Sequence, residues 1–133
     1  MELYTSHWRN QDLVGLDMVK VGISRGVPRG KAAKQLPYRY KRIPALFPSS
    51  DLLKGWKAQE ISPEEYTPVY RGYLDSLGVE QVTGQLKTKS AENGGKPLVL
   101  LCWCHPGEFC HRRVWADWYQ EKTGQEIPEL SAA

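Results

Sequence analysis

The chain has 133 residues, of which 41% are hydrophobic and 25% charged, and its formal net charge is +3. This composition is typical of a folded globular protein rather than a disordered one, and the length favours a single domain over residues 1–133. Three cysteines within nine residues do not suit a secreted disulfide framework, and neither a signal peptide nor a membrane-spanning apolar run is evident. We therefore expect a cytoplasmic protein with reduced thiols and no membrane partner.

Two strands are predicted in the first part of the chain. Residues 2–8 read ELYTSHW, and residues 18–24 read MVKVGIS, which is rich in β-branched side chains. Glycine and proline then recur over about residues 25–48, so this segment is predicted to be a long loop with a helical turn near residues 31–35. A loop of this length inside a small domain is often functional.

Positive charge is concentrated in the same loop. Between Arg25 and Arg42 there are seven basic residues and no acidic one, which leaves the rest of the chain with a net charge of −4. Such a block suggests a phosphate-bearing partner, and the alternative is a solvated positive loop. The candidate nucleic-acid surface consists of Arg29, Arg39, Lys41 and Arg42.

Helical patterns dominate the remainder. A short helix is expected over residues 49–58, with Ser50 or Asp51 as its cap. The run from Ser62 to Glu65 is a capping box that opens a second helix, which Gly78 ends. The apolar stripe predicted to face the core on this helix contains Tyr66, Val69, Tyr70, Tyr73, Leu74 and Leu77.

A further helix is expected over residues 80–90, with Val82 and Leu86 facing inward, followed by a turn at 93–95. Residues 97–103 form the most apolar run in the chain and predict a strand that is buried on both faces. A last helix is predicted over residues 110–122, and a partly flexible tail with a short edge strand over about residues 125–133. The inward stripe of the last helix contains Val114, Trp115, Trp118 and Tyr119.

Strands separated by helices predict an α/β fold, a small three-layer sandwich with a mainly parallel, Rossmann-like sheet. Such sheets bind ligands beyond the carboxyl ends of their strands. Three segments are expected to meet there: Ser6-His7, Ser24-Arg25-Gly26 and the loop from Cys102 to Cys110.

The last of these loops raises three alternatives. The first is a zinc or iron site, because thiolates and imidazoles are metal ligands, although the spacing does not match the common zinc modules. We expect no cofactor and keep zinc as the alternative. The residues of that metal site would be Cys102, Cys104, His105, Cys110 and His111.

The second alternative is a reactive thiol, and the third is an anion cradle. Cys110 would stand at the positive end of a helix dipole beside His111, a setting that favours a thiolate. Helix N-terminal N–H groups and an arginine also favour phosphate. Cys102, by contrast, is expected to be a buried strand residue. We predict Cys110, His111 and His7 as catalytic candidates, and Arg112, Arg25, Ser24 and Gly26 as phosphate-binding candidates.

These motifs resemble the bacterial, archaeal and phage family catalogued as domain-of-unknown-function family 488. That family carries a Leu-Leu-Cys strand and a Cys-His-Arg helix start, which correspond here to residues 100–102 and 110–112. The segments LYTSHW and Ile-Ser-Arg-Gly, at residues 23–26, are also similar. Family members often have an acidic residue where this chain has Cys104, so a functional acid is replaced here if that residue is needed. The resemblance implies a compact α/β domain and no particular activity.

The residues therefore favour a protein that binds a nucleotide or nucleic acid at the Cys-His-Arg helix start. One form of this hypothesis is an enzyme that processes a nucleotide or base, with His111, His7 or Cys110 supplying the chemistry. A second is a non-catalytic module that stacks bases and follows phosphates. A third is the metal-binding protein described above.

Overall fold

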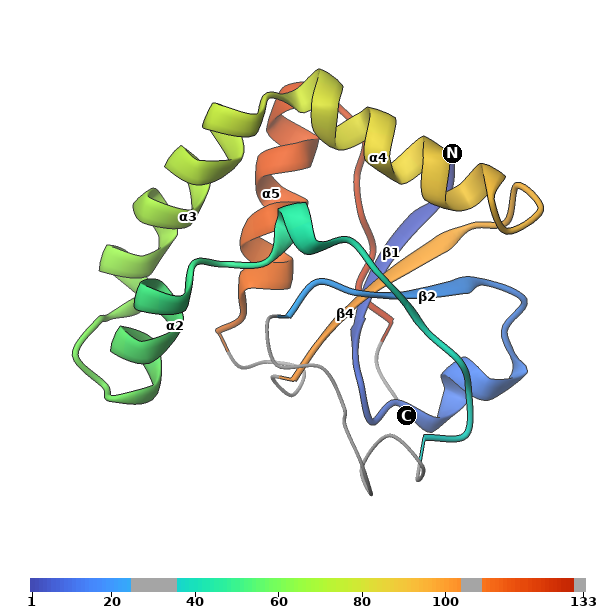
Figure 1. The fold of residues 1–133 in the computed structure, drawn as a ribbon, viewed down its shortest axis with the longest axis horizontal. Helices are drawn as coiled ribbons and strands as arrows, with labels where there is room; N and C mark the ends of the chain where they lie inside the picture. Colours follow the sequence, from blue (N-terminus) through green and yellow to red (C-terminus); the bar gives the residue numbers. More distant parts are fainter. Residues whose placement is uncertain (25–35, 104–108, 131–133) are drawn as a thin grey trace.

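A computed structural model describes residues 1–24, 36–103 and 109–130 of the chain (Figure 1). Its centre is a four-stranded, wholly parallel sheet with the strand order β1-β4-β2-β3. The strands are β1 (Leu3–His7), β2 (Val19–Gly22), β3 (Lys41–Arg42) and β4 (Leu98–Cys102). The prediction of an α/β fold with a parallel sheet is confirmed.

Strand β4 lies between β1 and β2, and all five of its residues are buried. Its side chains contribute to two separate cores because successive residues of a strand point to opposite faces. Leu98 and Leu100 belong to one core, whereas Val99 and Leu101 belong to the other. The continuous apolar run of the sequence thus corresponds to a central strand without a solvent face.

The α-helices gather on one side of the sheet, where Figure 1 shows α3, α4 and α5 together. Their bounds are α2 (Ser50–Lys57), α3 (Pro63–Leu77), α4 (Val79–Ala91) and α5 (His111–Thr123). The predicted inward residues of α5, which include Trp115 and Trp118, are buried. None of the helices in the described segments has both the length and the apolar character needed to cross a bilayer.

The other face of the sheet is covered, in the described residues, by 3-10 helix η1 (Gln11–Gly15) and by the segment that leads into β3. Trp8 and Leu13 are the buried residues of this smaller core outside β4. Tyr38 and Tyr40 pack against it from the segment for which a loop was predicted. That segment also contains β3 and the short 3-10 helix η2 (Pro44–Leu46), which the density of prolines did not suggest.

The predicted ends of several helices are confirmed. Ser62 caps α3 in a complete capping box, and Gly78 ends that helix at a φ of 86°. Gly124 ends α5 in the left-handed conformation, with a φ of 78°. The cap predicted for α2 was wrong, because the side chain of Ser49, not that of Ser50 or Asp51, accepts the hydrogen bond from the N–H of Leu52.

The stripe predicted for α3 is only partly correct. Tyr66, Tyr70 and Leu74 are buried, but Val69 is 56% exposed and Tyr73 is 37% exposed. The hydroxyl of Tyr73 instead donates to the carbonyl oxygen of Ala45 at 2.6 Å. A tyrosine can satisfy helical spacing and still lie at the edge of a core, because its polar end needs a partner.

The tail forms the expected edge contact. Glu129 makes an isolated parallel bridge with Thr5, and the N–H of Leu130 donates to the Thr5 carbonyl at 2.7 Å. The predicted helical turn at residues 31–35 lies outside the described residues.

Candidate functional site

The carboxyl ends of three strands meet as predicted. His7 at the end of β1 is in register with Cys102 at the end of β4, and the N–H of Trp8 donates to the Cys102 carbonyl. On the other side of β4, the N–H of Ile23 donates to the Leu101 carbonyl. This edge of the sheet carries the site, because the start of α5 lies against it.

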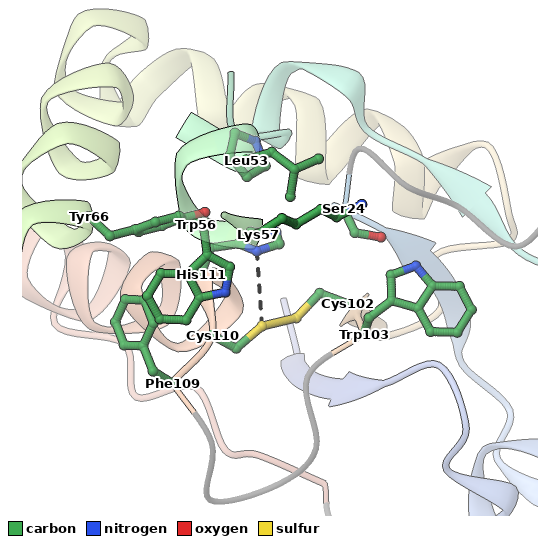
Figure 2. Close-up of a pocket in the computed structure, with 11 residues that line it drawn as sticks. Ser24, Leu53, Trp56, Lys57, Tyr66, Cys102, Trp103, Phe109, Cys110 and His111 are labelled. Carbon is green, nitrogen blue, oxygen red and sulfur yellow. Dashed lines mark hydrogen bonds between the residues drawn. A yellow bond between two sulfur atoms is a disulfide. The ribbon is translucent and has the colours of Figure 1, made fainter. Parts of the chain in front are cut away.

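Cys102 and Cys110 are joined as a disulfide (Figure 2). Cys102 is 1% exposed and Cys110 is 3% exposed. The expectation of reduced thiols is therefore wrong for this pair. The sequence did not predict this pairing. The two cysteines are eight residues apart, and the sequence does not show that the end of β4 and the start of α5 lie side by side.

A pocket of about 270 Å³ lies directly against this disulfide. Figure 2 shows the side chains of Leu53 and Lys57, both from α2, on the side of the pocket opposite the sulfurs. Among the described lining residues, Lys57 is the one lysine or arginine. Within the described residues, the pocket therefore combines a mostly apolar wall with a single cation.

Aromatic rings form much of that wall. The ring centroids of Trp56 and Phe109 are 5.0 Å apart, and those of Tyr66 and Phe109 are 5.4 Å apart. Trp103, which is 38% exposed, borders the pocket on another side and lies under the guanidinium of Arg9 at 5.8 Å. These ring contacts position the aromatic side chains around the pocket.

His111 is the first residue of α5, and Cys110 is its N-cap. The Nε2 of His111 lies 2.9 Å from the carbonyl oxygen of Ile23, which can only accept, so Nε2 carries the proton. The unprotonated Nδ1 then faces the Sγ of Cys110 at 4.0 Å, the dashed line in Figure 2. Burial lowers the pKa of His111 to about 4, and the hydrogen bond to Ile23 only partly offsets this effect.

Arg112 has a different environment from the one predicted. Its side chain is 1% exposed, and its guanidinium donates to both carboxylate oxygens of Glu129 and, from Nη1, to the Sγ of Cys102 at 3.0 Å. Arg112 does not line the pocket. The sequence gave no sign that Glu129 is its partner.

The other predicted residues separate into groups. Ser24 lines the pocket, and its hydroxyl accepts a hydrogen bond from the indole of Trp8 at 3.0 Å. His7 is buried beside Cys102 but does not line the pocket. The predicted site residues that lie outside the described residues are Arg25, Gly26, Arg29, Cys104 and His105.

The basic residues that were predicted to bind nucleic acid lie elsewhere. Arg39, Lys41 and Arg42 are exposed, and the first two border a surface groove of about 410 Å³. Lys20 and Lys96 border the same groove, near the start of β2. The aromatic pocket, by contrast, lies at the carboxyl end of the sheet, so the structure does not bring these two sets of residues together.

A metal ion would find three candidate ligands at the site. The sulfurs of Cys102 and Cys110 and a ring nitrogen of His111 lie within 4.8 Å of one another. Zinc binds thiolates, so this set becomes available only when the disulfide is reduced. The other two members of the predicted metal set lie outside the described residues.

Sequence reasoning missed most of the pocket. The sequence predicts Tyr66 as a core residue, and it does not indicate a site role for Trp56, Lys57 or Phe109. Phe109 adjoins the Cys-His-Arg motif, so its position was a usable signal. Trp56 and Lys57 come from α2, and nothing in their own segment indicates that they face the motif.

A family model described as the active DUF488-N3 subclade matches residues 3–123. The chain belongs to the DUF488 family. The match includes every element from β1 to α5 and therefore the whole candidate site. No curated protein and no solved structure matches the chain.

Proposed function

We propose that this DUF488 protein binds a nucleotide, with the base in the aromatic pocket and the phosphate toward Lys57. The supporting observation is the pocket itself: among the described residues, four aromatic side chains and one lysine surround a space of about 270 Å³. Aromatic side chains stack on bases of any sequence, and a pocket of this size suits one small ring system. Lys57 supplies the charge that a phosphate needs.

The proposal differs from the cradle predicted at the Cys-His-Arg helix start. Arg112 is engaged by Glu129 and Cys102, so its charge is compensated before any ligand arrives. The phosphate is therefore assigned to Lys57 and to Ser24 at the pocket wall rather than to Arg112.

Catalysis is the second part of the proposal. After reduction, Cys110 is a thiol whose neighbour His111 presents an unprotonated Nδ1 at 4.0 Å, an arrangement suited to proton removal. The thiolate would then act as a nucleophile on a nucleotide or its base. The description of the matching family model as active agrees with an enzyme.

Calorimetric titration with adenosine monophosphate, adenosine and inorganic phosphate tests the binding proposal. We expect the nucleotide to bind more tightly than the nucleoside, and phosphate alone to bind weakly. Lys57→Met should remove the difference between nucleotide and nucleoside, whereas Lys54→Met, an exposed lysine of the same helix outside the pocket, should not. Equal loss in the two variants, or no heat with any of the three ligands, would refute the proposal.

A non-catalytic nucleic-acid surface is the second candidate, and the groove with Lys20, Arg39, Lys41 and Lys96 favours it. Clustered cations bind polyphosphates with a steep dependence on salt. Binding of a single-stranded oligonucleotide should weaken sharply between about 50 and 200 mM salt. Replacing Arg39 and Lys41 by glutamine should weaken binding and reduce this slope; an unchanged slope would exclude the groove.

A further inference from the structure

The disulfide links two elements that the pocket also joins. Cys102 ends β4 and Cys110 caps α5, and both sulfur-bearing residues line the aromatic pocket while being nearly shielded from bulk water. In the described part of the chain, the pocket is therefore the route by which a reagent reaches the sulfurs (Figure 2).

The two sulfurs have different polar neighbours, a donor at Cys102 and an unprotonated ring nitrogen at Cys110. The Nη1 of Arg112 donates to the Sγ of Cys102 at 3.0 Å from a guanidinium that Glu129 fixes in place. The Nδ1 of His111 lies 4.0 Å from the Sγ of Cys110. A disulfide sulfur is a weak acceptor, whereas a thiolate is charged, so the buried guanidinium favours the reduced form of Cys102.

We propose that Cys102 and Cys110 are a reversible redox pair and that a low-molecular-weight thiol, entering through the aromatic pocket, is its reductant. The proposal goes beyond nucleotide binding, because it needs only the pocket and the two sulfurs. If Cys110 is also the nucleophile of the proposed nucleotide reaction, the same reduction releases the thiol that this attack requires.

The exchange proceeds in two balanced steps. The thiolate of the small thiol attacks the Sγ of Cys110, a mixed disulfide forms, and the Sγ–Sγ bond breaks with its electron pair on Cys102, where Arg112 stabilises the charge. A second small thiolate then attacks the sulfur of the first, which releases their disulfide and leaves Cys110 as a thiolate. Two small thiols are oxidised to one disulfide, the protein disulfide is reduced to two thiols, and the two protons of the small thiols end on the cysteines.

Thiol counting across a redox series tests the pair. A full-length Cys104→Ser protein, in which Cys102 and Cys110 are the two remaining cysteines, is equilibrated with mixtures of glutathione and its disulfide and is then alkylated and weighed. We expect a single transition between a form with no alkyl group and a form with two. A protein that remains unalkylated, or remains fully alkylated, across the whole series would overturn the proposal. Purified protein that contains one equivalent of zinc and whose two cysteines resist alkylation would also overturn it.

The route and the role of Arg112 are tested separately. In the wild-type protein, glutathione should reduce the pair at least tenfold faster than a protein-sized thiol, and equal rates would contradict entry through the pocket. Arg112→Gln should shift the equilibrium roughly tenfold toward the disulfide, the order expected for loss of a charge-assisted hydrogen bond. Arg71→Gln is the control, because Arg71 pairs with Glu121 instead of with a sulfur or with Glu129, and should change the equilibrium less than twofold. A shift of the same size in both variants would remove Arg112 from the mechanism.

None of these readouts uses a nucleotide, so failure of the redox pair is distinguishable from failure of nucleotide binding.

Discussion

Arg112 and Glu129 form an ion pair with an Nη2–Oε2 distance of 2.7 Å, and the arginine side chain is only 1% exposed. Glu129 also accepts a hydrogen bond from the hydroxyl of Thr5 at 2.6 Å. The pair thus connects the first turn of α5, the edge strand β1 and the C-terminal segment. It also orients the guanidinium whose Nη1 reaches Cys102.

Loss of the Glu129 charge should destabilise the fold. Glu129→Gln leaves a buried arginine without its counter-charge, and we expect the free energy of unfolding to fall by about 2 kcal/mol. The loss is smaller than at a fully buried pair because the Glu129 side chain is 20% exposed. Urea denaturation measures the change. Asp117→Asn, at an exposed position of α5, is the control and should alter stability by less than about 0.5 kcal/mol; equal effects would contradict a structural role for the pair.

Acid should weaken the fold through His111. Burial holds the pKa of His111 at about 4 in the folded protein, below its value of about 6.5 in an unfolded chain. The unfolded state therefore binds more protons between these two pH values. The contribution of neutral His111 to the free energy of unfolding is fully present above pH 6.5 and is lost as the pH falls toward 4.

His111→Gln isolates this contribution, because its amide can still donate to the Ile23 carbonyl but does not titrate. As the pH falls from 6.5 to 4, the free energy of unfolding of the variant should decrease by about 2–3 kcal/mol less than that of the wild type. Denaturation at several pH values in the oxidised form measures the difference. Parallel stability curves for the two proteins would show that His111 is not held as a neutral imidazole in the folded protein.

The Glu129 carboxylate should contribute at a lower pH. Burial by itself would raise its pKa, but hydrogen bonds from Arg112 and Thr5, with the charges of Arg112 and Arg113, hold the pKa below its usual value. Because the pKa is depressed on folding, this stabilisation is present above about pH 4.5 and is lost as the pH falls further. Comparison of Glu129→Gln with the wild type below pH 4.5 should show their stabilities converging; a constant difference would contradict the assignment.

The capping box of α3 offers a local test. The hydroxyl of Ser62 accepts from the N–H of Glu65, and the Glu65 carboxylate accepts from the N–H of Ser62. Ser62→Ala should reduce stability by about 1 kcal/mol. Ser76→Ala, an exposed serine near the end of the same helix, should have no such cost, since its hydroxyl bonds only within the helix. Thermal unfolding of both variants provides the comparison.

The sequence predicted those parts of the fold that depend on local chemistry. The buried run ending at Cys102 became the central strand, and Ser62, Gly78 and Gly124 set helix ends because capping and positive φ are local requirements. The convergence of His7, Ser24 and Cys102 followed from parallel strands alone. Local chemistry did not predict the Ser49 cap or the exposure of Val69, since either result depends on how neighbouring segments pack.

The site was less predictable because its partners come from distant segments. Glu129 reaches Arg112 only after the tail has returned along β1, and Trp56 approaches Phe109 only because α2 lies against α3. The Cys102–Cys110 bond was missed for a related reason. A count of three cysteines in a short stretch suggested reduced thiols, and it carried no information on the distance between the end of β4 and the start of α5.

The most direct test of the central claim, that the aromatic pocket binds a nucleotide, is the response of the tryptophan indole N–H signals to adenosine monophosphate in a nitrogen–proton correlation spectrum. The chain has five tryptophans, so each can be assigned and followed. Trp56 and Trp103 line the pocket, whereas Trp118 is not among the described lining residues and donates instead to Asp75. We expect saturable shifts for Trp56 and Trp103 and none for Trp118; unchanged Trp56 and Trp103 signals at millimolar nucleotide would contradict nucleotide binding in this pocket.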